Sequence, residues 1–130
     1  RPLDPGATVA ALMRMAERFS DLVARSERRL IVNISSKMGS IGGLSSGSSH
    51  IYRSTKAALN MITRCLSLEL AERGVVVVSM HPGHVQTEMG GNGSPVSPED
   101  LFAGMRQVID GLTREHSGRF FDHQGEELPW

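Results

Sequence analysis

The stretch Leu30-Ile31-Val32-Asn33-Ile34-Ser35-Ser36 decides the fold, because a short buried strand passes there directly into a polar loop. The first five residues are mostly β-branched and apolar on both faces, as a strand inside a parallel sheet requires. Residues 35–50 are rich in serine and glycine, which is typical of a loop rather than a strand or helix. We therefore expect a loop at the carboxyl end of a buried strand.

Helical and strand patterns alternate around this point. Helices are expected at residues 8–25, 51–72 and 101–113, the last capped by Ser97 with Pro98 in its first turn. Strands are expected at residues 30–34, 75–80 and 118–121, and the Pro-rich residues 2–6 are expected to form a linker or turn. This order predicts an α/β protein with one domain over residues 1–130, whose parallel sheet is covered on both faces.

Composition narrows the class of partner. The 130 residues include 14 basic and 14 acidic side chains, so no net field attracts nucleic acid or an anionic membrane, and a small-molecule partner is expected. No apolar run is long enough to cross a bilayer. The single cysteine, Cys65, lies in an apolar helical pattern, which predicts a packed thiol in a reducing compartment and favours the cytoplasm.

Three side chains that suit proton transfer surround the serine-rich loop. Tyr52 and Lys56 are four residues apart near the start of the long helix, so both project from one face. A neighbouring ammonium favours the charged form of a phenol and makes it a better acid and base. Ser36 could hydrogen-bond a substrate oxygen. The spacing alone also allows a purely structural alternative, in which Tyr52 and Lys56 are a solvated pair on a helix surface and Ser36 only shapes a turn.

The segments together resemble the short-chain dehydrogenase/reductase family from Leu30 onward. Residues 31–36 look like its strand ending in the catalytic serine, residues 52–60 like its active-site helix, and residues 81–87 like the Pro-Gly loop beside nicotinamide. Residues 35–43 and the ending at residues 118–130 are similar to the sniffer-like and C-factor-like carbonyl reductases. The resemblance implies part of a Rossmann-like doubly wound sheet, with the amino-terminal βαβ half missing.

The resemblance also implies an activity and the roles of individual residues. The activity is hydride transfer between NADP or NAD and a carbonyl or alcohol, with NADP favoured and the choice not readable. Tyr52 is then the acid/base, Ser36 orients the substrate oxygen, and Lys56 holds the nicotinamide ribose. The same resemblance places Pro82, Gly83, Val85 and Thr87 against the cofactor, and implies a homo-oligomer joined through helices at residues 9–24 and 52–72. A cleft is expected to be lined by Met38, Ile41, Leu44 and Met89, which favours an apolar ketone or aldehyde.

Departures from the family pattern leave alternatives open. The interval from Ser36 to Tyr52 is longer than usual, so Ser40 is a second candidate for the serine. The first helix lacks the family's asparagine at residues 8–11, and no segment supplies the Gly-x-x-x-Gly-x-Gly turn that binds pyrophosphate. The chain could therefore be a truncated remnant that only associates with other chains.

Two further rivals come from short motifs. Residues 43–47 satisfy Gly-x-Ser-x-Gly, so Ser45 with His50, His81 or Asp122 could form a hydrolase triad, although a long flexible loop surrounds the serine. His81 and His84 could be proposed as metal ligands, yet no supporting carboxylate or cysteine has suitable spacing, so no metal is expected.

Overall fold

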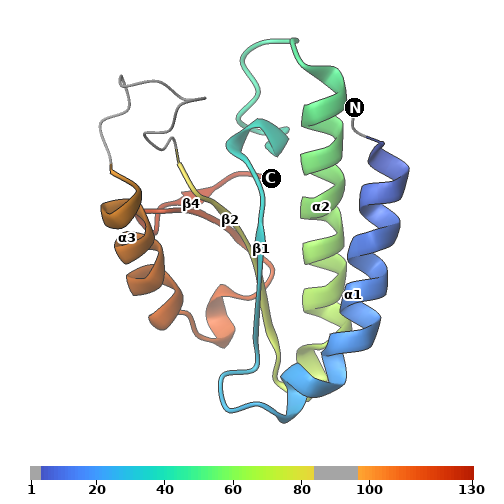
Figure 1. Ribbon diagram of the computed structural model, residues 1–130, viewed down its shortest axis with the longest axis vertical. Helices are drawn as coiled ribbons and strands as arrows, with labels where there is room; N and C mark the ends of the chain where they lie inside the picture. The colour runs from blue at the N-terminus through green and yellow to red at the C-terminus, as the bar shows by residue number, and fades with distance from the viewer. Residues whose placement is uncertain (1–3, 84–96) are drawn as a thin grey trace.

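The computed structural model describes residues 4–83 and 97–130. Figure 1 shows helices on both sides of a small sheet, which confirms the predicted α/β architecture. In chain order the elements are α1 (Pro5–Arg25), β1 (Leu30–Ile34), η1 (Lys37–Gly39), α2 (His50–Glu69), η2 (Ala71–Arg73), β2 (Val76–His81), α3 (Pro98–Asp110), η3 (Arg114–His116), β3 (Phe120–Asp122) and β4 (Glu127–Leu128).

The sheet has the order β1-β2-β3-β4, and its first three strands are parallel. Val32 of β1 lies opposite Val78 of β2, and His81 at the end of β2 lies opposite Asp122 of β3. The short strand β4 pairs antiparallel with β3, which the sequence analysis did not anticipate. The ends of β1 and β2 therefore meet at one edge, and the loops that follow them start side by side.

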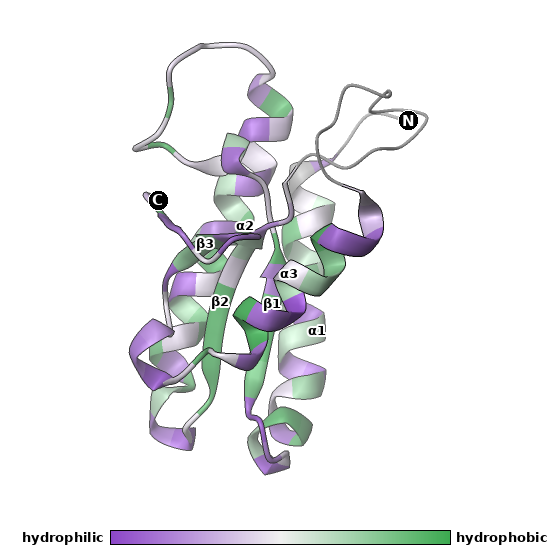
Figure 2. Ribbon diagram, turned by 90° about the vertical axis from the view of Figure 1, so that its left-hand side faces the viewer, coloured by the Kyte–Doolittle hydropathy of each residue, from purple (hydrophilic) through white to green (hydrophobic). Residues whose placement is uncertain are grey.

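The core has two layers, one on each face of β2. Val75 and Val77 pack with Ile62 and Leu66 of α2, against which α1 also packs. On the other face Met80 packs with the α3 residues Leu101 and Met105. Figure 2 shows the hydrophobic residues running along β1 and β2 between these helices. Because side chains alternate along a strand, an unbroken apolar run serves both layers.

A buried polar network connects α2 to both central strands. The Thr63 hydroxyl accepts hydrogen bonds from Asn33 Nδ2 of β1 at 2.9 Å and from the Ser79 hydroxyl of β2 at 2.8 Å. It donates to the Leu59 carbonyl at 3.0 Å, so its hydrogen-bonding capacity is fully used. Thr63 and Ser79 are completely buried, and an unpaired polar group there would be costly. The network therefore fixes how α2 sits on the sheet.

Two local predictions were wrong. Residues 2–6 were expected to form a linker or turn; residues 2 and 3 lie outside the described residues, but α1 already begins at Pro5, with the Asp4 carboxylate accepting from the Gly6 and Ala7 N–H groups at 3.0 and 3.3 Å. Proline suits this first helical position, because its missing N–H would have no partner in the helix. Cys65 was expected to be packed, but it is exposed, since it lies on the outer side of α2.

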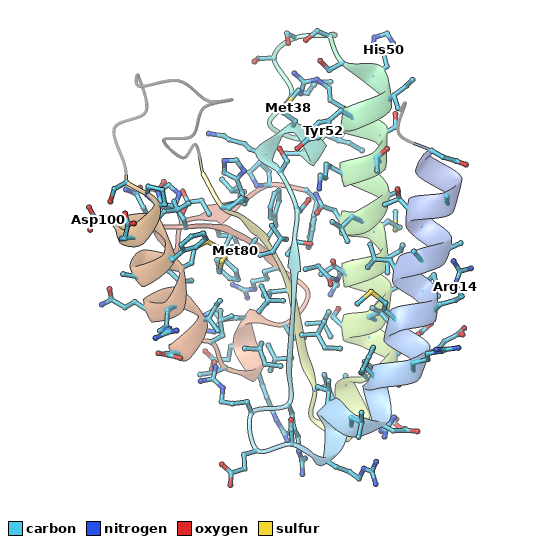
Figure 3. All side chains as sticks on the ribbon, in the orientation of Figure 1. Arg14, Met38, His50, Tyr52, Met80 and Asp100 are labelled. Atoms are coloured by element: carbon cyan, nitrogen blue, oxygen red, sulfur yellow. The ribbon has the colours of Figure 1, made fainter. Side chains whose placement is uncertain are left out.

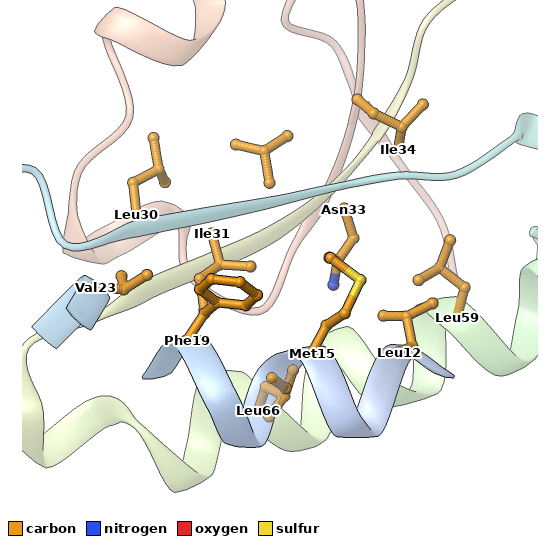
Figure 4. A pocket seen from close by; sticks show the side chains of 12 residues that line it. Leu12, Met15, Phe19, Val23, Leu30, Ile31, Asn33, Ile34, Leu59 and Leu66 are labelled. Atoms are coloured by element: carbon orange, nitrogen blue, oxygen red, sulfur yellow. The ribbon is translucent and has the colours of Figure 1, made fainter. Parts of the chain in front are cut away.

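An apolar groove of about 370 Å³ runs between α1 and β1. Figure 4 shows Met15 and Phe19 of α1 and Ile31 and Asn33 of β1 among the side chains around it. Met15 is 60% exposed and Phe19 is 50% exposed. Within the described residues, β1 pairs with β2 alone, so this groove accompanies an open edge of the sheet.

Candidate active site at the carboxyl edge of the sheet

Ser36 lies in a tight turn directly after β1. The preceding residue, Ser35, donates its N–H to the Met80 carbonyl of β2 at 2.8 Å, which ties the turn to the neighbouring strand. Ser36 caps η1, and its hydroxyl oxygen accepts the Met38 N–H at 3.1 Å. This contact uses a lone pair, so the Ser36 hydroxyl keeps its own hydrogen for donation to another oxygen. Among the described residues, the turn therefore fixes the serine without using its donor.

The turn packs closely against α2. A Cβ atom added to Gly39 would lie 2.8 Å from the carbonyl carbon and the Cβ of Lys56, so only glycine allows this approach. The Asn60 side chain donates to the Gly39 carbonyl, and the Arg53 guanidinium donates to the Met38 carbonyl, both at 3.4 Å. The serine turn is thus pressed onto the part of α2 that carries Lys56.

Tyr52 and Lys56 lie together on the first turns of α2. The Lys56 Nζ atom is 5.7 Å from the centre of the Tyr52 ring, which is within the range of a cation–π contact. Figure 3 shows Tyr52 near the end of the molecule where β1 and β2 finish. Tyr52 is 36% exposed and Lys56 is half-buried, so solvent and small molecules can reach the phenol. The four-residue spacing therefore does bring the two side chains together.

Ser40, the second candidate serine, already uses its hydroxyl hydrogen elsewhere. Its hydroxyl donates to the Pro129 carbonyl at 2.6 Å and accepts the Gly43 N–H at 2.9 Å. Next to it, the Ile41 N–H donates to the Trp130 carbonyl, while the Trp130 ring stacks on Phe120 at 5.5 Å. Ser40 therefore binds the last residues of the chain to the loop. Because the Ser40 hydroxyl hydrogen is already used in this way, Ser36 is the better candidate for contact with substrate.

His81 contributes a contact that the sequence analysis missed. Its Nδ1 atom accepts the Lys37 N–H at 3.0 Å, across 44 residues of sequence. Burial lowers the pKa of His81 below its ordinary value of 6.5, and the nearby His123 and Lys37 lower this pKa further, whereas Asp122 raises it. Motif spacing carried no signal for this bond, because it depends on strand register and not on local sequence.

The Pro-Gly loop is only partly described. Gly83 has a φ of +83°, and a Cβ atom there would lie 2.7 Å from His123 Nδ1, so this position needs glycine. Pro82 precedes it at the end of β2. Val85, Thr87, His84 and Met89 lie outside the described residues.

The cleft expected from Met38, Ile41 and Leu44 is not one continuous hollow. Ile41 lines a separate cavity of about 220 Å³ with Met61 and Trp130. Tyr52 instead borders a shallow hollow formed with residues 47–51. Leu44 is 51% exposed in the loop, and Met38 is half-buried in η1. Over the described residues, Met38, Ile41 and Leu44 therefore do not line one shared apolar cleft.

The rival sites find little support. Ser45 lies in exposed irregular chain, with neither a strand directly before it nor a helix directly after it, so no nucleophile elbow is formed. Throughout residues 4–83 and 97–130, no three His, Cys, Asp or Glu side chains are grouped as metal ligands would be. In the same ranges, no helix combines the length and apolar character needed to cross a bilayer.

The family model described as short chain dehydrogenase matches residues 7–95. The chain belongs to this family. C-signal of Myxococcus xanthus is 49% identical over 102 residues, which cover 78% of this chain and 61% of that protein. The 1-hydroxy-2-glutathionyl-2-methyl-3-butene dehydrogenase of a Rhodococcus strain is 40% identical over 101 residues, covering 75% of this chain and 45% of that protein. The chain thus spans about half to three fifths of these relatives.

Solved structures of carbonyl reductases share the fold. The NADPH-bound carbonyl reductase from chicken fatty liver is 34% identical with a TM-score of 0.82, over 93% of this chain and 53% of that one. The carbonyl reductase Sniffer of D. melanogaster is 38% identical with a TM-score of 0.73, over 78% of this chain and 41% of that one. The fold therefore matches about half of a Rossmann-like reductase, and the family resemblance is confirmed.

Proposed function

We propose that the chain carries the hydride-transfer site of an NAD(P)-dependent oxidoreductase that acts on a small carbonyl compound or the corresponding alcohol. The observation that carries this proposal is the pairing of Lys56 Nζ with the Tyr52 ring, 5.7 Å apart, beside the serine turn. An acid/base with a cation at its side is what reduction of a carbonyl requires, because the oxygen must gain a proton as the carbon gains a hydride. When bound, the nicotinamide supplies that hydride.

The protein side of the reaction is divided among three residues. Tyr52 donates a proton to the carbonyl oxygen, or removes one from the alcohol in the reverse direction. Ser36 donates its hydroxyl hydrogen to the same oxygen, since its own cap contact uses only a lone pair. Lys56, half-buried below Tyr52, binds the ribose hydroxyls of the cofactor through its ammonium hydrogens.

The described residues fit the nicotinamide end of the cofactor better than the pyrophosphate end. Gly83 in the loop after β2 has no side chain, and Pro82, Val85 and Thr87 stand in the same order as in the family's cofactor-binding loop. No Gly-x-x-x-Gly-x-Gly turn is present in the 130 residues. We favour NADP over NAD, because solved relatives from chicken and Pseudomonas aeruginosa contain NADPH or NADP.

The proposal can be tested by cofactor fluorescence and turnover. The full 130-residue chain should change the emission of NADPH at micromolar concentration, and Lys56→Ala should weaken this binding. Arg14→Ala is the matched control, because it removes an exposed positive charge from the outside of α1 (Figure 3). Tyr52→Phe should abolish carbonyl reduction with dinucleotide affinity nearly unchanged. Full turnover by Tyr52→Phe would refute the assigned role.

The apolar groove beside β1 favours a second candidate function, that of an association module without catalysis. Exposed Met15 and Phe19 on α1, and Met61 and Leu68 on α2, are surfaces that a second chain could cover. We infer a homo-oligomer through these helices in either case, and a cytoplasmic location. Unchanged NADPH fluorescence in the presence of the chain, together with a stable dimer in sedimentation, would favour the association module.

A further inference from the structure

The serine turn, residues 36–39, is hydrogen-bonded to β2 through the imidazole of His81. The Lys37 N–H, one residue after Ser36, donates to His81 Nδ1 at 3.0 Å. A ring nitrogen accepts a hydrogen bond only when it carries no proton, so the bond requires neutral His81 with its hydrogen on Nε2. A protonated ring would present a second N–H to the Lys37 N–H, and the contact would become repulsive.

The groups around His81 favour this neutral form. Among the described residues, Lys37 faces it from η1, Asp122 from β3, and His123 from the turn after β3. Burial is the largest influence and lowers the pKa of His81, with His123 and Lys37 acting in the same direction. Asp122 opposes them, but its Oδ1 already accepts the Gln124 and Glu126 N–H groups at 2.9 Å each.

The residue that hydrogen-bonds to His81, Lys37, directly follows Ser36, whose hydroxyl is proposed to contact the substrate. Lys37 is the first residue of η1, and Ser36 is the residue that caps it. Ser36 accepts the Met38 N–H, and Lys37 lies between these two residues in the chain. A shift of Lys37 therefore changes the contact that holds the Ser36 hydroxyl. On the other side, Ser35 is tied to the Met80 carbonyl and has less freedom to follow.

We propose that His81 is a positioning residue for Ser36, and that protonation of its ring releases Lys37 and disorders the serine turn. The link between His81 and the turn stands on the geometry alone. Its consequence for hydride transfer rests on the function proposed above. Neutral His81 is then a condition for the active arrangement, and the site works only above the pH at which this ring gains a proton.

The first experiment needs no activity. Long-range ¹H–¹⁵N NMR spectra of the full chain should show His81 at pH 8 with Nε2 protonated and Nδ1 bare. As the pH is lowered, the Lys37 amide resonance should move with the midpoint of the His81 ring. A protonated Nδ1 at pH 8, or a Lys37 amide that ignores the ring titration, would overturn the proposal.

Variants separate the hydrogen bond from general stability. His81→Asn keeps an acceptor near the place of Nδ1 but cannot titrate, whereas His81→Leu keeps bulk without an acceptor. The Lys37 amide should exchange about tenfold faster in the Leu variant, which corresponds to the loss of one ordinary hydrogen bond, and should stay protected in the Asn variant. His116→Asn is the matched control, because His116 Nδ1 accepts the Thr113 N–H at 2.9 Å before β3, away from the site. If His81→Leu fails to fold, the wild-type titration remains the test.

The second experiment reads the effect on catalysis. In the wild-type chain kcat should fall on the acid side with the midpoint of the Lys37 amide, and His81→Asn should lose this acid limb while retaining turnover at neutral pH. An acid limb that persists unchanged in His81→Asn would overturn the positioning role. A chain that titrates as expected but never reduces a carbonyl would instead refute the proposed function and leave the His81 contact intact.

Discussion

The serine turn and the groove between α1 and β1 lie on the same strand but are built in different ways. The turn is held by polar contacts from three separate segments, namely His81 of β2, Asn60 of α2 and Pro129 near the end of the chain. The groove is lined by apolar side chains, and Phe19 remains half-exposed in it. The contrast indicates that the turn is fixed by contacts within this chain, while the groove leaves apolar side chains exposed.

The largest change in stability is expected on the turn. Gly39→Ala should lower the free energy of unfolding by about 1–3 kcal/mol, because the new Cβ would meet backbone atoms of α2 that cannot rotate away. Urea unfolding followed by circular dichroism measures this. Gly47→Ala is the control, since a Cβ atom there would contact nothing within 4 Å. Equal losses in the two variants would show that the turn is not pressed against α2.

The polar network below the turn should be next in effect. Thr63→Val leaves Asn33 and the buried Ser79 without their shared acceptor, and should lower the free energy of unfolding by about 1–3 kcal/mol. Thr55→Val provides the same substitution in the same helix, where the buried hydroxyl bonds, within residues 4–83 and 97–130, to the Ile51 carbonyl alone. The loss at Thr63 should clearly exceed the loss at Thr55, and a reversed order would contradict the role of the network.

A smaller, pH-dependent effect should also belong to the turn. Because folding lowers the pKa of His81, the unfolded chain gains this proton first as the pH falls. The contribution of His81 to stability is therefore complete above about pH 6.5, and is lost as the pH falls from there through the folded pKa. Urea midpoints of the wild type and of His81→Asn should lie close together above this window and diverge below it, because the Asn variant keeps an acceptor but cannot gain the proton. Parallel pH curves would speak against the contact.

The groove should show the smallest effect on stability. Phe19→Ser should change the free energy of unfolding by about 0.5 kcal/mol, as is usual for an exposed position. Its effect should instead appear in sedimentation equilibrium as weaker self-association. Arg14→Ala, on the same helix, is the control for a change at the surface. A large loss of stability in Phe19→Ser without any change in association would show that the groove is ordinary core.

Regular elements could be read from the sequence where local patterns determine them. The strand Leu30–Ile34 was predicted to the residue, and Ser97 with Pro98 marked the start of α3. The strand β4 was missed, because Glu127–Leu128 is too short to show any periodicity. The start of α1 was missed because Pro5 was interpreted as a breaker rather than as the first helical residue.

In the candidate site, too, some contacts could be predicted from local sequence and others could not. Tyr52 and Lys56 could be paired from their spacing, since one helical turn separates them. The contact of His81 with Lys37 and that of Ser40 with Pro129 join residues 44 and 89 positions apart, so only the folded arrangement reveals them. Sequence spacing identified groups that could do chemistry, and strand register determined which groups hold them in place.

The bonds from Ser40 and Ile41 to Pro129 and Trp130 have a practical consequence for handling the protein. A purification tag fused directly behind Trp130 would pull on a residue that is stacked on Phe120 and hydrogen-bonded to the loop beside the candidate serine. Recombinant material intended for binding or turnover assays is therefore better tagged ahead of α1, where Asp4 is exposed.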